Sequence, residues 1–148
     1  MNGSLQNVHG ELLFRMVASA AVGERLKVSG PIGGRYFSTA TGGGRFEGPR
    51  LQGRLLEGFA WAPHRTRTGD AAHMHYDVRV LLLTDDGFRI LMRYRGVNSP
   101  AYPHRSWRTA PVFEAEHGPY AWLNAIQAVG LGRVTGSDVE YEIYQLTD

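Results

Sequence analysis

The chain has 148 residues, the length of one domain, and contains no cysteine. The absence of cysteine excludes disulfides, thiolate metal sites and a cysteine nucleophile, and it fits a cytoplasmic location. Sixteen basic and fourteen acidic side chains give a formal charge of +2, which is small for a nucleic-acid-binding protein. No apolar run approaches the about 20 residues of a membrane span. We therefore expect neither a nucleic acid nor a membrane as partner.

Glycine and proline divide the sequence into short segments that are rich in alternating, β-branched and aromatic residues, a pattern typical of strands joined by tight turns. In chain order the predicted strands cover residues 11–19, 35–41, 50–58, 73–84, 88–95, 108–116, 126–134 and 139–146. Residues 1–9 are expected to form a flexible N-terminus of this single domain. At most one short helical turn is predicted, near Tyr120–Leu123. The pattern predicts an all-β fold, either a closed barrel or a sandwich.

The clearest hairpin joins residues 73–84 to residues 88–95 through Asp86–Gly87, where glycine allows the left-handed conformation of a tight turn. Such a turn places Asp77 opposite the Arg95 end of the second strand. An ion pair of Asp77 with Arg95 or with Arg79 is therefore expected.

Alternation along the first strand of this hairpin separates two faces. One face carries His75, Asp77 and Arg79 and becomes apolar at Leu81, as a wall running from a polar mouth into an interior would. The other face includes Tyr76 and is otherwise apolar, so it predicts the core.

The stretch GGGRFEGPRLQG, residues 42–53, combines five glycines with a proline. It is not a phosphate-binding loop, because it lacks a Lys followed by Ser or Thr and because a strand pattern follows it. Two interpretations remain: a bend that closes a barrel corner, or a bend that turns Glu47 inward. In an extended segment Phe46 and Glu47 point to opposite sides, so only one of them can face the interior.

The stretch HMHYD raises the question of a metal site. His73, His75 and Asp77 share one strand face, and imidazole and carboxylate groups bind zinc, iron or manganese. Arg79 follows on the same face, where its charge would oppose a cation. The sequence favours surface histidines, and we predict neither a metal nor another cofactor.

Several motifs occur together in an order and spacing that resemble those of the family known as domain of unknown function 3237. They are TGGGRFEGPRLQG, Trp61, DVRVLLLTDDG, RYRG and YAWLN…VGLGR. The resemblance extends roughly over residues 11–146 and is most specific at residues 41–53. It implies a small antiparallel β-barrel with an interior cavity, assembled as a homo-oligomer, a dimer or larger.

The function hypothesis is a small-molecule-binding barrel that performs cofactor-free proton-transfer chemistry such as isomerisation, cyclisation, dehydration or lyase cleavage. Glu47 is the candidate acid/base, because burial against aromatic walls would raise the pKa of its carboxyl group. His75 or Asp77 would carry the second proton, and Arg79 or Arg95 would stabilise an anion.

An apolar or aromatic metabolite would be the ligand of this barrel. The residues expected to bind it are Phe46, Trp61, Tyr94, Arg95, Trp122 and Asn124.

Two other functions remain open: a non-catalytic carrier or sensor that uses the same interior, and a structural module whose interior is filled by side chains. The individual residues have structural interpretations as well. Asp77 and Arg79 could form a salt bridge that fixes strand register, Glu47 could cap a turn, and Asn124 could satisfy local backbone groups.

Overall fold

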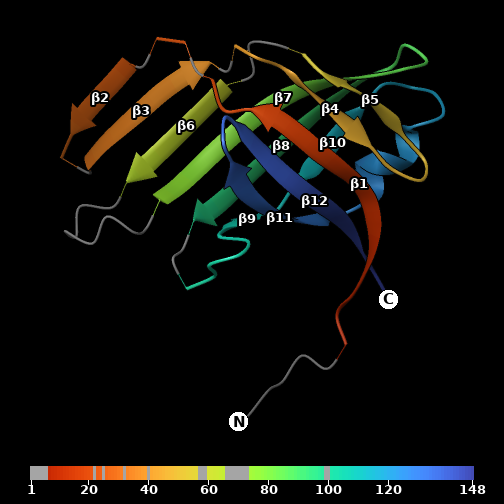
Figure 1. The fold of residues 1–148 in the computed structure, drawn as a ribbon. Coiled ribbons are helices and arrows are strands. Elements are labelled where there is room, and N and C mark those ends of the chain that lie inside the picture. Colours follow the sequence, from red (N-terminus) through yellow and green to blue (C-terminus); the bar gives the residue numbers. More distant parts are fainter. Residues whose placement is uncertain are drawn as a thin grey trace.

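The computed structural model describes residues 7–21, 23–24, 26–31, 33–39, 41–56, 60–65, 74–98 and 101–148. Strands dominate this part of the chain (Figure 1). They are β1 (His9–Ser19), β2 (Leu26–Gly30), β3 (Gly33–Thr39), β4 (Gly44–Glu47), β5 (Gln52–Leu55), β6 (Ala60–Arg65), β7 (Met74–Thr84), β8 (Arg89–Asn98), β9 (Trp107–Thr109), β10 (Val112–Ala115), β11 (Ala128–Thr135) and β12 (Asp138–Thr147). One 3-10 helix, η1 (Ala121–Ala125), lies between β10 and β11. Within the described ranges no helix has the length and apolar character needed to span a membrane.

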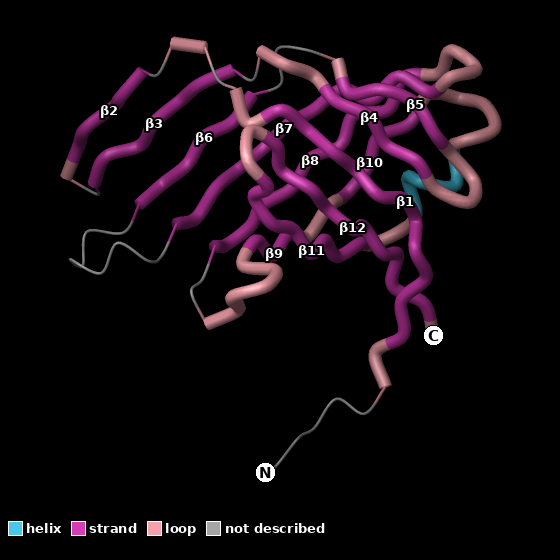
Figure 2. The backbone as a smooth tube through the Cα atoms, viewed as in Figure 1, coloured by secondary structure: helices cyan, strands magenta, loops and turns pink. Residues whose placement is uncertain are grey.

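Eight antiparallel strands close into a barrel, which is one of the two folds that the sequence pattern predicted and the one that the family resemblance implied. Their order is β7, β8, β9, β11, β12, β1, β4 and β5, and β5 pairs with β7 again. The first half of β7 pairs with β6, so β6, β3 and β2 extend the sheet beyond the barrel on one side (Figure 2).

The predicted strands are found with small shifts at their ends, and the helical turn is η1. The sequence did not predict β2, β4 and β6 as strands, and β1 begins at His9, inside the expected flexible segment. The predicted strand 108–116 is divided into β9 and β10. Pro111 lies at the break, because proline has no backbone N–H to continue a strand ladder.

The glycine-rich stretch forms the corner β4–β5, closed by a hydrogen bond from the Gly48 amide to the Leu51 carbonyl, 2.9 Å. At this corner the backbones approach closely. A Cβ added to Gly48 would lie 1.9 Å from the carbonyl oxygen of Leu13, and one added to Gly53 would lie 2.1 Å from that of Leu83. The glycines are therefore required because β4 and β5 press against β1 and β7, which confirms the interpretation as a barrel corner.

Inside the barrel, large side chains lie beside glycines on neighbouring strands. One row of cross-strand partners runs Trp107, Gly132, Tyr141, Met16, Phe46 and Gly53. A second row runs Tyr76, Gly96, Thr109, Gly130 and Ile143. Alternation of large and small residues allows large side chains to lie side by side inside a small barrel.

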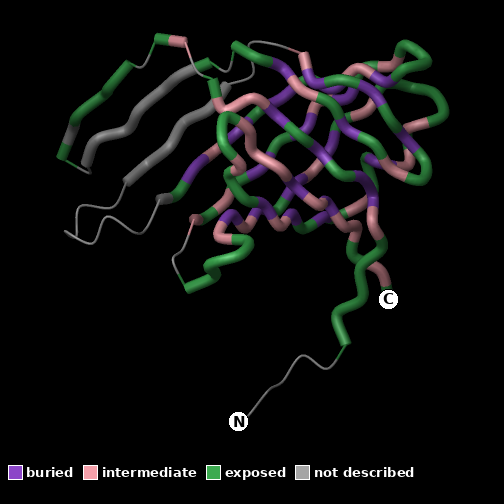
Figure 3. The backbone as a smooth tube through the Cα atoms, viewed as in Figure 1, coloured by how far each residue is buried: buried purple, intermediate pink, exposed green. Residues whose placement is uncertain are grey.

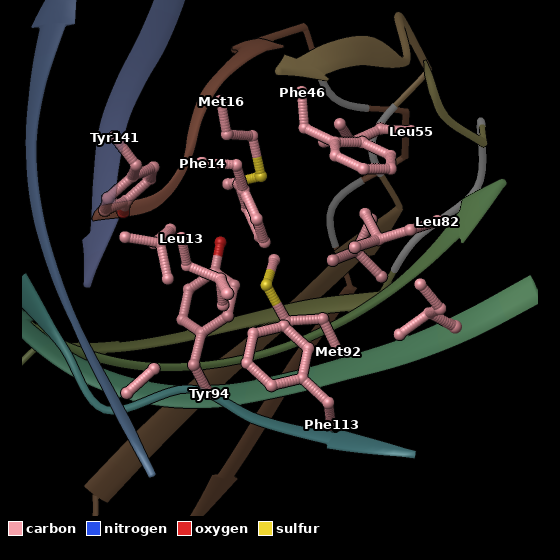
Figure 4. Close-up of a cluster of buried hydrophobic side chains, with 14 of the residues drawn as sticks. Leu13, Phe14, Met16, Phe46, Leu55, Leu82, Met92, Tyr94, Phe113 and Tyr141 are labelled. Carbon is pink, nitrogen blue, oxygen red and sulfur yellow. The ribbon is translucent and has the colours of Figure 1, made fainter. Parts of the chain in front are cut away.

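The interior between opposite walls is packed with apolar side chains. Figure 4 shows Phe14, Met16 and Phe46 pointing toward Met92 and Phe113 across the barrel. Phe14, Phe46 and Met92 are completely buried. Along the strands buried and exposed positions alternate (Figure 3). The described charged side chains occupy the exposed or partly exposed positions and therefore lie on the outer surface.

We predict that Gly53→Ala lowers the free energy of unfolding by about 2–3 kcal/mol, because the new methyl group meets backbone rather than a movable side chain. Gly136→Ala is the control. Gly136 has φ 58° and open space around it, so alanine there costs about 1 kcal/mol of left-handed strain. Urea unfolding measures both values. If the two substitutions lower the free energy of unfolding by the same amount, β5 does not approach β7 closely.

Candidate functional site

Glu47 lies on the outer face of the barrel, not in its interior. Its neighbour Phe46 is fully buried, whereas the Glu47 side chain is 69% exposed. The Arg45 Nε atom lies 3.0 Å from Glu47 Oε1, and the same guanidinium binds both carboxylate oxygens of Asp85. The expectation of a Glu47 carboxyl group buried against aromatic walls is wrong, because alternation in β4 assigns the inward position to Phe46.

The other ionisable candidates also lie outside. His75 and Arg79 are exposed on β7, and Asp77 is partly exposed. Asp77 pairs in register with Arg95, whose Nε lies 3.5 Å from Asp77 Oδ2, so this predicted ion pair is confirmed. The Arg95 side chain is 86% exposed, and such a pair contributes little to stability. His73 lies outside the described residues.

The predicted ligand-binding residues are distributed over different environments. Phe46 and Tyr94 face the interior. Trp122 is half-buried on η1, with the Arg50 guanidinium 3.7 Å from its ring centroid. Asn124 pairs with the backbone of Ala115, accepting from its amide at 2.8 Å and donating to its carbonyl at 3.2 Å.

Asn124 thus satisfies strand backbone, which was one of its two interpretations. Trp61 belongs to β6, opposite Val78 of β7, and its side chain lies outside the described set.

Three buried tyrosines bring polar groups into the barrel interior: Tyr76 of β7, Tyr94 of β8 and Tyr141 of β12. The hydroxyl oxygens of Tyr76 and Tyr141 lie 3.4 Å apart. The ring centroid of Tyr94 lies 6.3 Å from that of Tyr76 and 6.0 Å from that of Tyr141. Trp107 of β9 packs on Tyr76 at 4.7 Å, and we call these four residues the tyrosine cluster.

Glycines create the space for this cluster. A Cβ at Gly96 would lie 2.6 Å from the Tyr76 hydroxyl oxygen, and one at Gly132 would lie 2.4 Å from the Tyr141 ring. The two phenols therefore lie directly over the backbone of neighbouring strands.

The tyrosine hydroxyls contact one another, and one polar atom on a neighbouring strand lacks a described partner. The 3.4 Å separation of the Tyr76 and Tyr141 hydroxyls exceeds the usual O–H···O length of about 2.7 Å. The buried Thr109 Oγ1, on the same cross-strand row as Tyr76, has no hydrogen-bond partner among the described residues. Buried polar atoms left in this state call for an explanation, and a functional role is one of the common ones.

The apolar surroundings keep the three phenols neutral. Burial raises the pKa of Tyr76, Tyr94 and Tyr141 above the ordinary value of tyrosine, because a phenolate would lose its hydration. A neutral phenol in such a site can donate a hydrogen bond to an oxygen atom on which negative charge develops.

This cluster was not predicted from the sequence. Tyr76 was placed on the core face, correctly, and for that reason was not considered as a functional residue. Tyr141 received no role. The available signal was the pairing of tyrosines with glycines on predicted neighbouring strands, but strand order is needed to see it.

We predict that the three buried phenols stay protonated in the native protein at a pH where exposed tyrosines ionise. The phenols of the unfolded chain ionise at about pH 10, and the buried phenols ionise at a higher pH. The unfolded state then holds fewer protons, so the free energy of unfolding falls as the pH rises above about 10.

Phenolate absorbance, measured against pH in native buffer and in urea, tests this prediction. In urea all seven tyrosines of the chain should ionise together. If all seven also do so in protein that keeps its native circular dichroism, the three phenols are not shielded.

Comparison with known proteins agrees with the geometry of the barrel. A β-barrel-like protein from Acinetobacter baumannii AYE is 26% identical and has a TM-score of 0.81, with 97% of this chain and 99% of that chain covered. A conserved protein of unknown function from Rhodopseudomonas palustris is 19% identical with a TM-score of 0.79, covering 96% and 99%. A protein of Penicillium herquei described as an enzyme is 22% identical with a TM-score of 0.69, covering 98% and 99%.

No curated protein matches the chain. The family model of DUF3237, described as a protein of unknown function, matches residues 9–146, from the first residue of β1 to the penultimate residue of β12. The chain belongs to the DUF3237 family.

Proposed function

We propose that the barrel binds a small apolar or aromatic molecule through a carbonyl or phenolic oxygen at the tyrosine cluster, and that it catalyses a proton-transfer reaction of that molecule. The observations that carry the proposal are the buried hydroxyls in an apolar interior: the Tyr76 and Tyr141 oxygens lie at the long separation of 3.4 Å, and Thr109 Oγ1 has no hydrogen-bond partner among the described residues. A ligand oxygen would complete their hydrogen bonds. The aromatic rings of Tyr94 and Trp107 suit a flat, apolar ligand body.

The chemistry follows from the charge state of the phenols. Neutral donors with a raised pKa bind a carbonyl oxygen and stabilise it more strongly as it becomes an enolate, because their hydrogen bonds strengthen as charge develops. Isomerisation, cyclisation, dehydration and lyase cleavage of a carbonyl compound can each pass through an enolate and would gain from this stabilisation. The cluster therefore takes over the anion-stabilising role first assigned to Arg79 and Arg95, which lie on the outer surface.

The Penicillium herquei enzyme supports the proposal at the level of the fold. Its chain shares the same barrel over nearly its full length, so the architecture is compatible with catalysis. At 22% identity the likeness does not extend to a substrate.

Binding of prodan, a neutral and fluorescent naphthyl ketone, tests the proposed site. We expect wild-type protein to bind it, with an emission shift that reports a hydrogen bond to the ketone and with quenching of tryptophan fluorescence. Tyr76→Phe and Tyr141→Phe keep each ring and remove the hydroxyl, and each should weaken binding by about five- to tenfold.

Tyr120→Phe is the matched control, because the Tyr120 hydroxyl donates to Asp86 at 2.8 Å and lies outside the cluster. If both cluster variants bind prodan as tightly as the wild-type protein does, the tyrosine cluster is not the binding site.

Exchange of the ketone's α-protons for deuterium separates an enzyme from a carrier. If the phenols stabilise the enolate that forms when deuteroxide from the solvent removes an α-proton, wild-type protein should accelerate exchange in D₂O. The Tyr76→Phe/Tyr141→Phe double variant should lose the acceleration. Nuclear magnetic resonance of prodan measures the rate. Tight binding without accelerated exchange would assign the barrel to carriage or sensing instead.

A further inference from the structure

A second candidate site lies on the outer wall of the barrel, where a groove of about 530 Å³ crosses β1, β12 and β11. These strands pair side by side, and the loop before β9 contributes His104 and Arg105 to the lining (Figure 1). The volume falls within the range of small-molecule sites.

Two cross-strand rows supply the outward-facing side chains of the groove. One row is Arg15, Glu142 and Leu131, and the other is Val17, Glu140 and Arg133. Exposed Val17 and partly buried Leu131 thus provide apolar surface among charged groups.

The two glutamates are occupied by different partners. Glu140 accepts two hydrogen bonds from Arg133, from Nε at 3.2 Å and from Nη2 at 3.1 Å. Glu142 accepts a hydrogen bond from the Tyr144 hydroxyl. This bond, together with the positive charges of Arg105 and Arg15, holds the pKa of Glu142 below its usual value.

Among the described residues, the other two arginines have N–H donors that no acceptor occupies. Arg15 Nε lies 4.0 Å from Glu142 Oε1, and Arg105 Nη1 lies 3.5 Å from Glu142 Oε2. Both separations exceed the length of a good N–H···O hydrogen bond, and each guanidinium has five N–H donors. Three arginines against two glutamates also leave the groove with net positive charge.

We propose that this groove binds a small organic anion in which a carboxylate is attached to an apolar body. Arg15 and Arg105 receive the carboxylate, because guanidinium groups match its planar geometry. Val17 and Leu131 contact the apolar body. Tyr144 is a positioning residue, since its hydrogen bond holds Glu142 and leaves the arginine donors open. The two arginines lie on the outer surface, and Tyr141 is the residue of the tyrosine cluster that also lines the groove.

Calorimetric titration with sodium benzoate tests the proposal, with sodium chloride and inorganic phosphate as comparison salts at matched ionic strength. We expect benzoate to bind wild-type protein and Arg15→Gln to weaken that binding by about tenfold. Arg89→Gln is the matched control. Its side chain is 65% exposed against 66% for Arg15, it pairs with Glu116 at 3.1 Å, and it lies outside the groove. Equal losses in the two arginine variants would overturn the proposal.

Glu142→Gln should change benzoate affinity in the direction opposite to Arg15→Gln. Removal of the competing carboxylate should tighten benzoate binding several-fold, whereas a purely structural role of Glu142 predicts weaker binding or none. Circular dichroism confirms that each variant is folded. Absence of benzoate binding to wild-type protein would also overturn the proposal. So would binding of phosphate without binding of benzoate, because the apolar surface would then have no part in recognition.

Discussion

Closure of the sheet is the constraint on which the rest of this structure depends. β7 pairs with both β5 and β8, and β1 pairs with both β12 and β4, so each of these strands has partners on both edges. Once the sheet is closed, every inward side chain competes for the same limited volume. The interior rows meet that limit by placing glycines beside tyrosine, tryptophan and phenylalanine.

The same constraint separates the two kinds of chemistry that the protein offers. Strand alternation places the charged residues of β4, β7 and β8 on the outside, where solvent weakens their interactions. The interior retains polar atoms of another kind, the neutral phenols of Tyr76, Tyr94 and Tyr141. Under the two proposals, chemistry inside this barrel would therefore rely on hydrogen bonds from neutral donors, and recognition by charge would take place on the outer wall.

Much of the fold could be predicted from the sequence because its signals are local. The alternation of residues 73–84 and the Asp86–Gly87 turn identified the hairpin and the Asp77–Arg95 pair. The glycines of residues 42–53 predicted a corner. Local patterns could not decide which face of a strand points into the barrel when both faces carry apolar residues. β7 is such a strand, with Leu81 outside and Leu82 inside.

Much of the candidate site depends on contacts between distant segments, which explains why sequence reasoning missed it. Tyr76 and Tyr141 are 65 positions apart and meet only because β7, β8, β9, β11 and β12 follow one another around the barrel. The groove likewise joins β1 to β11 and β12, from opposite ends of the chain. Neither arrangement leaves a motif of fixed spacing.

The central claim is that the interior phenols, and not the outer carboxylates, form the reactive site. Prodan binding and α-proton exchange should be compared in two double variants, Tyr76→Phe/Tyr141→Phe and Glu47→Gln/Asp77→Asn. The account predicts that the first loses both signals and that the second keeps them at the wild-type level. Loss of both signals in the second variant, with the first unaffected, would contradict it.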